Sequence, residues 1–326
     1  MTRHKVEIVG GAGYIGSELA DHLSSAFDVK VVDKNILPKK LASNNLEYEC
    51  CSIVEYDQTR HALEGSDVVI HTAIVQIPTI NEQKELGYST NIVGTQNVCR
   101  VVNETASIKG MILIGSWHVF GEKGIEGTVD EEFGFRPDAV AARARLYALS
   151  KIGQEVAVRM YGEMSEKTYA VIRVGTVLGE EMPEQTAAKI FINRALKGQS
   201  ITPYRVDMYR PMLYVDVNDV CRMCEVYVSR ILNGDTGDLP RIVNLLWPDP
   251  ITIIELAREI RESITTLSNG RIRPKIEIVD SNVRSFYTSK SKGKMKVNIH
   301  KAQRLLNSKL TRPSQSVERI VRNAIR

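Results

Sequence analysis

The chain has 326 residues, 43% of them apolar and 25% charged, so it can bury a large core and divide into two lobes. No apolar run approaches the roughly 18 residues that a membrane-spanning helix needs, and the first predicted strand begins too early for a signal peptide. Five cysteines without a disulfide-framework spacing indicate a reducing compartment. We therefore expect a cytoplasmic protein with no membrane partner.

The N-terminal residues predict a strand at 5–9 and a helix at 14–25, joined by the glycine-rich turn Gly10-Gly-Ala-Gly-Tyr-Ile-Gly16. Three glycines at this spacing serve a tight turn, a close approach of pyrophosphate and packing of the helix on the strand. The helix N-terminus adds a favourable field for phosphate. This context predicts a dinucleotide-binding turn.

A second predicted strand, at 28–33, ends in an acid. Asp33 lies seventeen residues after Gly16, near the spacing at which a carboxylate accepts hydrogen bonds from the adenosine ribose. This favours NAD over NADP. The neighbouring Lys34 keeps NADP open, because a basic side chain there can bind a 2′-phosphate.

Further along the chain, predicted strands and helices alternate up to about residue 175. Such alternation predicts an α/β fold with a doubly wound, mostly parallel sheet of the Rossmann type. Ligands bind such sheets beyond the carboxyl ends of the strands. The further strands are expected at 46–51, 67–73, 110–116 and 168–174, and the helices at 82–106 and 147–164.

The remainder of the chain has a less regular order and predicts a smaller α/β lobe that binds substrate. We place the dinucleotide-binding domain at 1–175 and the lobe mainly at 176–326, with some of its segments returning to the first domain. Its helices are expected at 184–198, 216–232, 252–265 and 299–307.

Two features of this second half suggest other functions that we disfavour. Residues 270–326 hold 15 Lys or Arg against 3 Asp or Glu, but no nucleic-acid-binding motif accompanies them. We favour a solvated basic surface, or one that serves an anionic ligand or partner. Cys221 and Cys224 have the CxxC spacing without a second ligand pair, so we expect two buried residues and no metal.

Tyr147 and Lys151 are four residues apart in a predicted helix, so their side chains are neighbours on one face. A lysine ammonium beside a phenol lowers the phenol's pKa from its usual value of about 10. We therefore expect Tyr147 to act as a base near neutral pH.

The ordered series GGAGYIGS, DVVIHTA, NIVGTQN, GSWHVFG, YALSK and RPMLYVDVNDV resembles the extended short-chain dehydrogenase/reductases. More narrowly, it is similar to the NAD-dependent nucleotide-sugar epimerases and dehydratases, and the similarity covers nearly the whole chain. The resemblance implies NAD, a nucleotide-sugar substrate and a homodimer formed through the helices at 82–106 and 147–164.

The resemblance also implies site residues. Tyr147 would take a proton from a sugar hydroxyl, Ser116 would hold that hydroxyl, and Lys151 would bind the nicotinamide ribose. Arg210 would anchor the nucleotide diphosphate. Cofactor contacts are expected from Gly10, Gly13, Tyr14, Ile15, Gly16, Asp33, Ser52, Ile53, Thr72, Ala73, Asn91, Tyr147, Lys151 and Val174, and substrate contacts from Ser116, His118, Thr176 and Arg210.

The chain also departs from the family pattern. Trp117-His118 stands where dehydratases carry an Asp-Glu pair and related decarboxylases a Glu, which disfavours both reactions. Ser52 stands where an acid often reaches the adenine. Among the remaining reactions, the long substrate lobe and Arg210, which suits a diphosphate, favour an epimerase that oxidises and re-reduces a sugar hydroxyl, at C4. The alternatives are a sugar or sugar-acid dehydrogenase that releases NADH and a non-catalytic NAD-binding protein.

Overall fold

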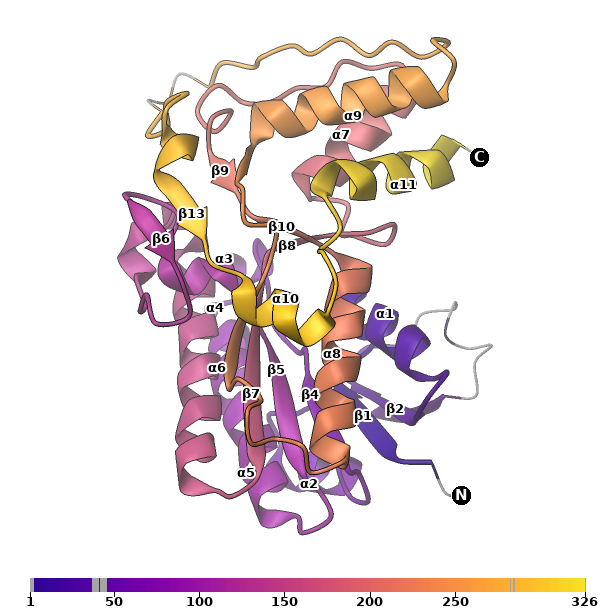
Figure 1. Ribbon diagram of the computed structural model, residues 1–326, viewed down its shortest axis with the longest axis vertical. Helices are drawn as coiled ribbons and strands as arrows, with labels where there is room; N and C mark the ends of the chain where they lie inside the picture. Colours follow the sequence, from indigo (N-terminus) through magenta and orange to yellow (C-terminus); the bar gives the residue numbers. More distant parts are fainter. Residues whose placement is uncertain (1–2, 37–40, 42–45, 282, 284, 326) are drawn as a thin grey trace.

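The computed structural model describes residues 3–36, 41, 46–281, 283 and 285–325. A sheet of seven parallel strands lies between two layers of helices, and a smaller lobe covers one end of it (Figure 1). The strand order is β11-β7-β5-β4-β1-β2-β3, which confirms the predicted doubly wound fold. The strands are β1 (Lys5–Val9), β2 (Asp28–Asp33), β3 (Glu47–Cys50), β4 (Val68–His71), β5 (Gly110–Ser116), β7 (Thr168–Val174) and β11 (Ile242–Leu245).

The central strands are apolar because both of their faces are buried, as is usual in parallel sheets. Successive side chains of β5 alternate between two cores: Ile112 packs in one cluster with Leu19, and Leu113 packs in the other with Val98. One face carries α1 (Tyr14–Leu23) and α8 (Val217–Leu232), and the other carries α2 (Tyr56–Ala62), α5 (Thr95–Glu104) and α6 (Arg145–Met164).

The helix predicted at 82–106 is interrupted. It consists of α3 (Thr79–Glu82), α4 (Lys84–Tyr88), a π-helical turn at Ser89–Gly94 and then α5. Within the wider turn, the Asn91 amide donates to the Val75 carbonyl and accepts from the Val75 N–H, at 3.1 and 2.7 Å. This tertiary contact explains the irregularity, and π turns of this kind are frequent at functional sites.

The lobe is built from helices and pairs of short strands. The sequence analysis missed its last helix, α11, as well as α2 of the sheet layer. Although β11 and α8 come from the second half of the sequence, they pack in the sheet layer (Figure 1). The helices are α7 (Ala187–Leu196), α9 (Ile253–Leu267), α10 (His300–Leu306) and α11 (Pro313–Ile325), and the strand pairs are β8 (Thr176–Leu178) with β10 (Tyr214–Asp216), β9 (Pro211–Met212) with β12 (Ile251–Thr252), and β6 (Gly127–Val129) with β13 (Met295–Val297).

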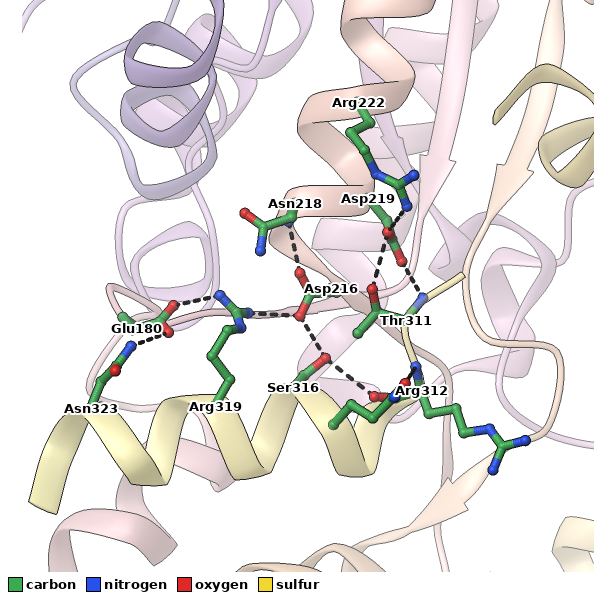
Figure 2. Close-up of polar contacts among 11 residues, drawn as sticks. Glu180, Asp216, Asn218, Asp219, Arg222, Thr311, Arg312, Ser316, Arg319 and Asn323 are labelled. Atoms are coloured by element: carbon green, nitrogen blue, oxygen red, sulfur yellow. Dashed lines mark hydrogen bonds and ion pairs between the residues drawn. The ribbon is translucent and has the colours of Figure 1, made fainter. Parts of the chain in front are cut away.

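A buried carboxylate at the end of β10 attaches α11 to the lobe (Figure 2). Asp216 accepts hydrogen bonds from the Ser316 hydroxyl at 2.6 Å and from Arg319 at 2.7 Å, and it caps α8 through the N–H of Asn218 at 2.9 Å. Arg319 also binds Glu180 at 3.0 Å. One carboxylate therefore fixes the start of α8 and the position of the C-terminal helix.

Two further observations concern the functions considered above. No helix within the described part of the chain combines the length and the apolar character that a membrane crossing requires. Cys221 and Cys224 are both buried on α8. Part of the basic segment that follows α9 runs beside residues 201–204, where Ile276 and Val279 form isolated β-bridges with Ile201 and Tyr204.

Candidate active site

A cavity of about 470 Å³ lies where the carboxyl ends of the strands meet the lobe. Both the glycine turn after β1 and lobe residues such as Arg210 and Met212 line it. The predicted site residues that line it are Gly10, Gly13, Tyr14, Ile15, Gly16, Asp33, Ser52, Ile53, Thr72, Ala73, Ser116, His118, Tyr147, Lys151, Val174, Thr176 and Arg210.

Asn91 is the predicted contact residue that does not line the cavity. Its side chain is fully buried and binds the backbone of Val75 and the hydroxyl of Ser150, 3.0 Å away. Val75 itself lines the cavity. Asn91 therefore holds a segment of the cavity wall in place, and its contact with the cofactor stays a prediction.

The glycine turn has the close packing that the sequence predicts for a phosphate-binding loop. Gly10 has φ +82°, and a Cβ atom there would lie 2.4 Å from the backbone nitrogen of Ala73. A Cβ atom on Gly16 would lie 2.4 Å from the carbonyl oxygen of Gly10. Only glycine fits at either position, so the backbone stays open to a ligand at the N-terminus of α1.

Asp33 is held against the same turn. One carboxylate oxygen accepts from the N–H of Ala12 at 3.1 Å, and the other accepts from the backbone and side-chain nitrogens of Asn35 at 2.8 and 3.0 Å. The carboxylate therefore keeps a fixed orientation at the cavity edge, where it can accept from a ribose hydroxyl. Lys34 lines the cavity beside it.

Tyr147 and Lys151 lie on α6 as predicted, but their electrostatics differ from the expectation. The Lys151 ammonium donates to the carbonyl of Ile114 at 2.8 Å, and burial lowers the pKa of Lys151 to about 7. Burial also raises the pKa of Tyr147, and a hydrogen bond with Ser116 offsets only part of this rise. The prediction that Lys151 makes Tyr147 a ready base is therefore not met in this state.

Glu122 is a residue of the cavity wall that the sequence analysis missed. Its Oε1 atom lies 3.3 Å from Nε2 of His118, and its side chain is almost fully buried. Burial acts to raise the pKa of Glu122, but the hydrogen bonds from His118 and from the N–H of Ala141, together with the nearby charge of Arg143, outweigh it, and the net pKa is lowered. The four-residue spacing between His118 and Glu122 was the available signal. The cavity wall therefore does contain an acid close to Trp117-His118, the position at which dehydratases carry an Asp-Glu pair. Glu122 contacts this position through the ring of His118.

Arg210 lies on the lobe side of the cavity and is 8% exposed. Its Nε and Nη1 atoms are buried and have no hydrogen-bond partner among the described residues. The nearest carboxylate, on Asp207, is 4.0 Å from Nη1. A buried guanidinium with donors to spare is suited to an anionic ligand, because leaving such donors unpaired is costly.

Comparison with known proteins agrees with the family resemblance that the sequence motifs indicated. Residues 6–245 match the model of the "NAD dependent epimerase/dehydratase family". A putative UDP-glucose 4-epimerase of Methanocaldococcus jannaschii is 28% identical over 241 residues, which cover 71% of this chain and 76% of that protein.

A second relative, UDP-glucuronic acid decarboxylase 1 of Danio rerio, is 24% identical over 84% of this chain, which spans only 64% of the length of that protein. The solved UDP-glucuronic acid 4-epimerase of Bacillus cereus, in complex with NAD, has the same fold, with a TM-score of 0.75 and 20% identity over 99% of this chain and 100% of that one. The protein is thus an enzyme whose cofactor is NAD, and the chain belongs to the NAD dependent epimerase/dehydratase family.

Proposed function

We propose that the enzyme is a nucleotide-sugar epimerase that acts at C4 of the sugar. The observation that carries the proposal is that one cavity joins the glycine turn and Tyr147 to the buried guanidinium of Arg210. A ligand that reaches from Tyr147 to Arg210 would place a sugar at one end and a diphosphate at the other. The relative named as a putative UDP-glucose 4-epimerase supports the same reaction.

In this proposal the cofactor half of the cavity holds NAD, which when bound supplies a hydride acceptor. The backbone of the turn at Gly10 and Gly13 would receive the pyrophosphate, and Asp33 would accept from the adenosine ribose. Lys151 would donate to the nicotinamide ribose. Ser116 would fix the reacting sugar hydroxyl, and Tyr147 would take its proton and later return it.

The substrate half would bind the nucleotide sugar through Arg210, whose fork of donors matches phosphate oxygens. His118 and Thr176, which also line the cavity, would contact the sugar. A redox-neutral reaction requires that the keto sugar stays bound until it is reduced again. The covering lobe and the diphosphate anchor would both retain it.

One observation favours the alternative, a sugar-acid dehydrogenase. The Ser-Trp-His phrase at 116–118 is closer to sugar-acid dehydrogenases of the same superfamily than to epimerases, and the hydroxyl of Ser116 is bonded to the imidazole of His118. Arg143, which lines the same cavity, would then meet the substrate carboxylate.

The two reactions can be distinguished by incubating the purified protein with UDP-glucose, UDP-galactose and the UDP-uronic acids. An epimerase interconverts a C4 pair without build-up of NADH, whereas a dehydrogenase releases stoichiometric NADH. Tyr147→Phe should lower turnover at least 100-fold while NAD binding is retained. Unchanged turnover in this variant would exclude the proposed role of Tyr147.

We also propose that the enzyme is a homodimer that pairs through α6. Large apolar side chains are exposed on this helix: Leu149 is 46% exposed, Met160 57% and Met164 62%. Tyr88, at the end of α4, is 61% exposed. Such a stripe on a monomer marks an interaction surface. Leu149→Asp should give a monomer by light scattering, and Phe286→Asp, at an apolar residue that is 75% exposed elsewhere, should not.

A further inference from the structure

The side chains of Tyr147, Ser116, His118 and Glu122 form a line from the reaction centre into the protein. Ser116 is the last residue of β5, and His118 and Glu122 follow it closely in the sequence. Oγ of Ser116 hydrogen-bonds to the phenol of Tyr147, and it lies 3.2 Å from Nδ1 of His118. The other ring nitrogen of His118, Nε2, lies 3.3 Å from Oε1 of Glu122. Each residue therefore contacts the next one through a polar atom.

The carboxylate at the end of this line determines the direction of the hydrogen bonds. Oε2 of Glu122 already accepts from the N–H of Ala141 at 3.1 Å and from the hydroxyl of Tyr287 at 3.4 Å. An ionised carboxylate can only accept, so Nε2 of His118 carries the ring proton. Nδ1 of the neutral ring is then an acceptor and receives the proton of the Ser116 hydroxyl.

The hydrogen bonds that connect Tyr147 to His118 through Ser116 suggest how the phenol of Tyr147 loses its proton. The phenol is buried and its pKa is raised, while the ammonium of Lys151 is directed to the carbonyl of Ile114. Before the phenol can take a proton from a substrate hydroxyl, it must give up its own. The side-chain base connected to it through a hydrogen-bonded hydroxyl is His118.

We propose that His118, oriented by Glu122, accepts the proton of Tyr147 through Ser116 and later returns it. The Tyr147 O–H bond breaks as a proton joins Oγ of Ser116, and the original Ser116 proton moves to Nδ1 of His118. The products are a phenolate and an imidazolium, so the total charge is unchanged. The imidazolium is then paired with the Glu122 carboxylate.

Glu122 is therefore a positioning residue that acts through His118, and His118 acts on Tyr147 through Ser116. The inference rests on the proposed function of Tyr147. The other ionisable groups around the pair are few. Arg143, Asp207 and Tyr287 interact with Glu122, and Tyr147 faces the edge of the His118 ring with centroids 5.4 Å apart. If His118 had only a structural role, such as its packing against Trp117, either tautomer of the ring would serve equally well.

The substitution Glu122→Gln tests the direction of the hydrogen bonds without an activity assay. Because the N–H of Ala141 requires an acceptor, the new side chain should place its carbonyl oxygen there and its NH₂ group toward His118. Nε2 must then accept, so the ring proton moves to Nδ1 and the bond to Ser116 reverses. Nitrogen-15 spectra of the histidine side chains, assigned with His118→Asn, should show this exchange of protonated and unprotonated nitrogens.

The protein offers a matched control in His22, whose Nε2 atom lies 2.7 Å from Oε2 of Glu225 outside the cavity. Glu225→Gln changes the same kind of contact and should leave the His118 signals and turnover unchanged. A wild-type His118 that carries its proton on Nδ1 would overturn the proposal.

The second readout is turnover of the nucleotide sugar. Glu122→Gln and His118→Asn should each lower kcat about 100-fold, because general acid–base assistance is typically worth that factor or more. KM should change little in Glu122→Gln, because Glu122 is not assigned a contact with the sugar. Turnover within threefold of the wild type in either folded variant would contradict the relay.

A wild-type enzyme that is inactive on every nucleotide sugar would count against the proposed function alone, because the nitrogen-15 result would still decide the relay.

Discussion

The two sides of the cavity are constructed differently. The sheet side presents backbone: the turn at Gly10–Gly16 and the strand ends around Ala73 approach so closely that side chains are excluded. The lobe side presents side chains, of which Arg210 is buried with unpaired donors. The sheet side therefore excludes side chains by close backbone approach, while the lobe side offers a buried charge to its ligand.

The two regions also differ in how they are held together. The sheet is buried between two apolar cores, and one of them extends to Val317, Ile320 and Val321 of α11. The lobe holds this last helix additionally through the buried Asp216 and its partners (Figure 2). Apolar packing tolerates change of pH, and a polar network depends on each partner. This difference suggests four tests.

The largest effect is expected for the backbone of the sheet side. Gly10→Ala places a Cβ atom 2.4 Å from the Ala73 nitrogen in a residue with φ +82°. Strain at positive φ costs about 1–2 kcal/mol, and the backbone clash adds to it. We expect NAD affinity, measured by titration calorimetry, to fall at least about 100-fold, since a tenfold loss corresponds to about 1.4 kcal/mol.

Gly65 provides the control, because it has the same φ of +82° with open space around its Cβ position. Gly65→Ala should therefore lower stability by about 1 kcal/mol and leave NAD affinity unchanged. Equal loss of NAD affinity in both variants would show that strain at positive φ, and not the close approach of Ala73, is responsible.

One polar group within the sheet layer departs from the apolar pattern and should make its stability depend on pH. Burial raises the pKa of Glu7, on β1, from 4.5 to about 7, although Lys30 lies 3.5 Å away. The folded state therefore holds the Glu7 proton more tightly than the unfolded state. The stability that this provides is complete below pH 4.5 and is lost as the pH rises through 7, a difference of about 3 kcal/mol.

Glu7→Gln should remove this dependence. Urea unfolding at pH 5 and pH 8 should show the wild type losing stability relative to the variant as the pH rises. Glu47→Gln changes an exposed acid that pairs with Lys5 on the same sheet, and it should lack this effect. Parallel pH dependences for wild type and Glu7→Gln would mean that Lys30 keeps Glu7 ionised.

On the lobe side, Arg210→Gln should weaken binding of the nucleotide sugar and leave NAD binding unchanged. Charge-assisted hydrogen bonds are worth about 1.5–3 kcal/mol, so we expect a 10- to 100-fold rise in the Kd of UDP-glucose. Arg205→Gln removes an exposed guanidinium that pairs with Asp280 and is the matched control. Equal affinities in Arg210→Gln and wild type would place the diphosphate elsewhere in the cavity.

The contrast between the two sides also explains what the sequence could predict. Gly10, Asp33 and Ser116 were identified because each lies at the end of a strand or directly after it, and strand ends meet at one edge of a parallel sheet. Strands β5 and β7 were predicted at their observed bounds because they are continuous apolar runs.

Other features depend on tertiary contacts, on burial or on turns of the chain, which the residue patterns did not predict. Asn91 was assigned to the cofactor, but the backbone of Val75, in another segment, satisfies its amide. The ionisation of Tyr147 was predicted from Lys151 alone, whereas burial dominates. Glu122 reaches His118 only because the chain turns at Gly121, where φ is +88°.

The smallest effect concerns the attachment of α11. Arg319→Met removes one of three groups that bind Asp216 and leaves the Ser316 hydroxyl and the N–H of Asn218 in place. Because Arg319 is about one-third exposed, we expect a loss of about 1 kcal/mol. Arg322→Met, which breaks an exposed pair with Glu318 on the same helix, should cost only a few tenths of that value.

Hydrogen exchange should show faster opening of α11 in Arg319→Met and unchanged exchange in β5. Faster exchange in both elements would mean that lobe and sheet unfold together, which would remove the distinction between them.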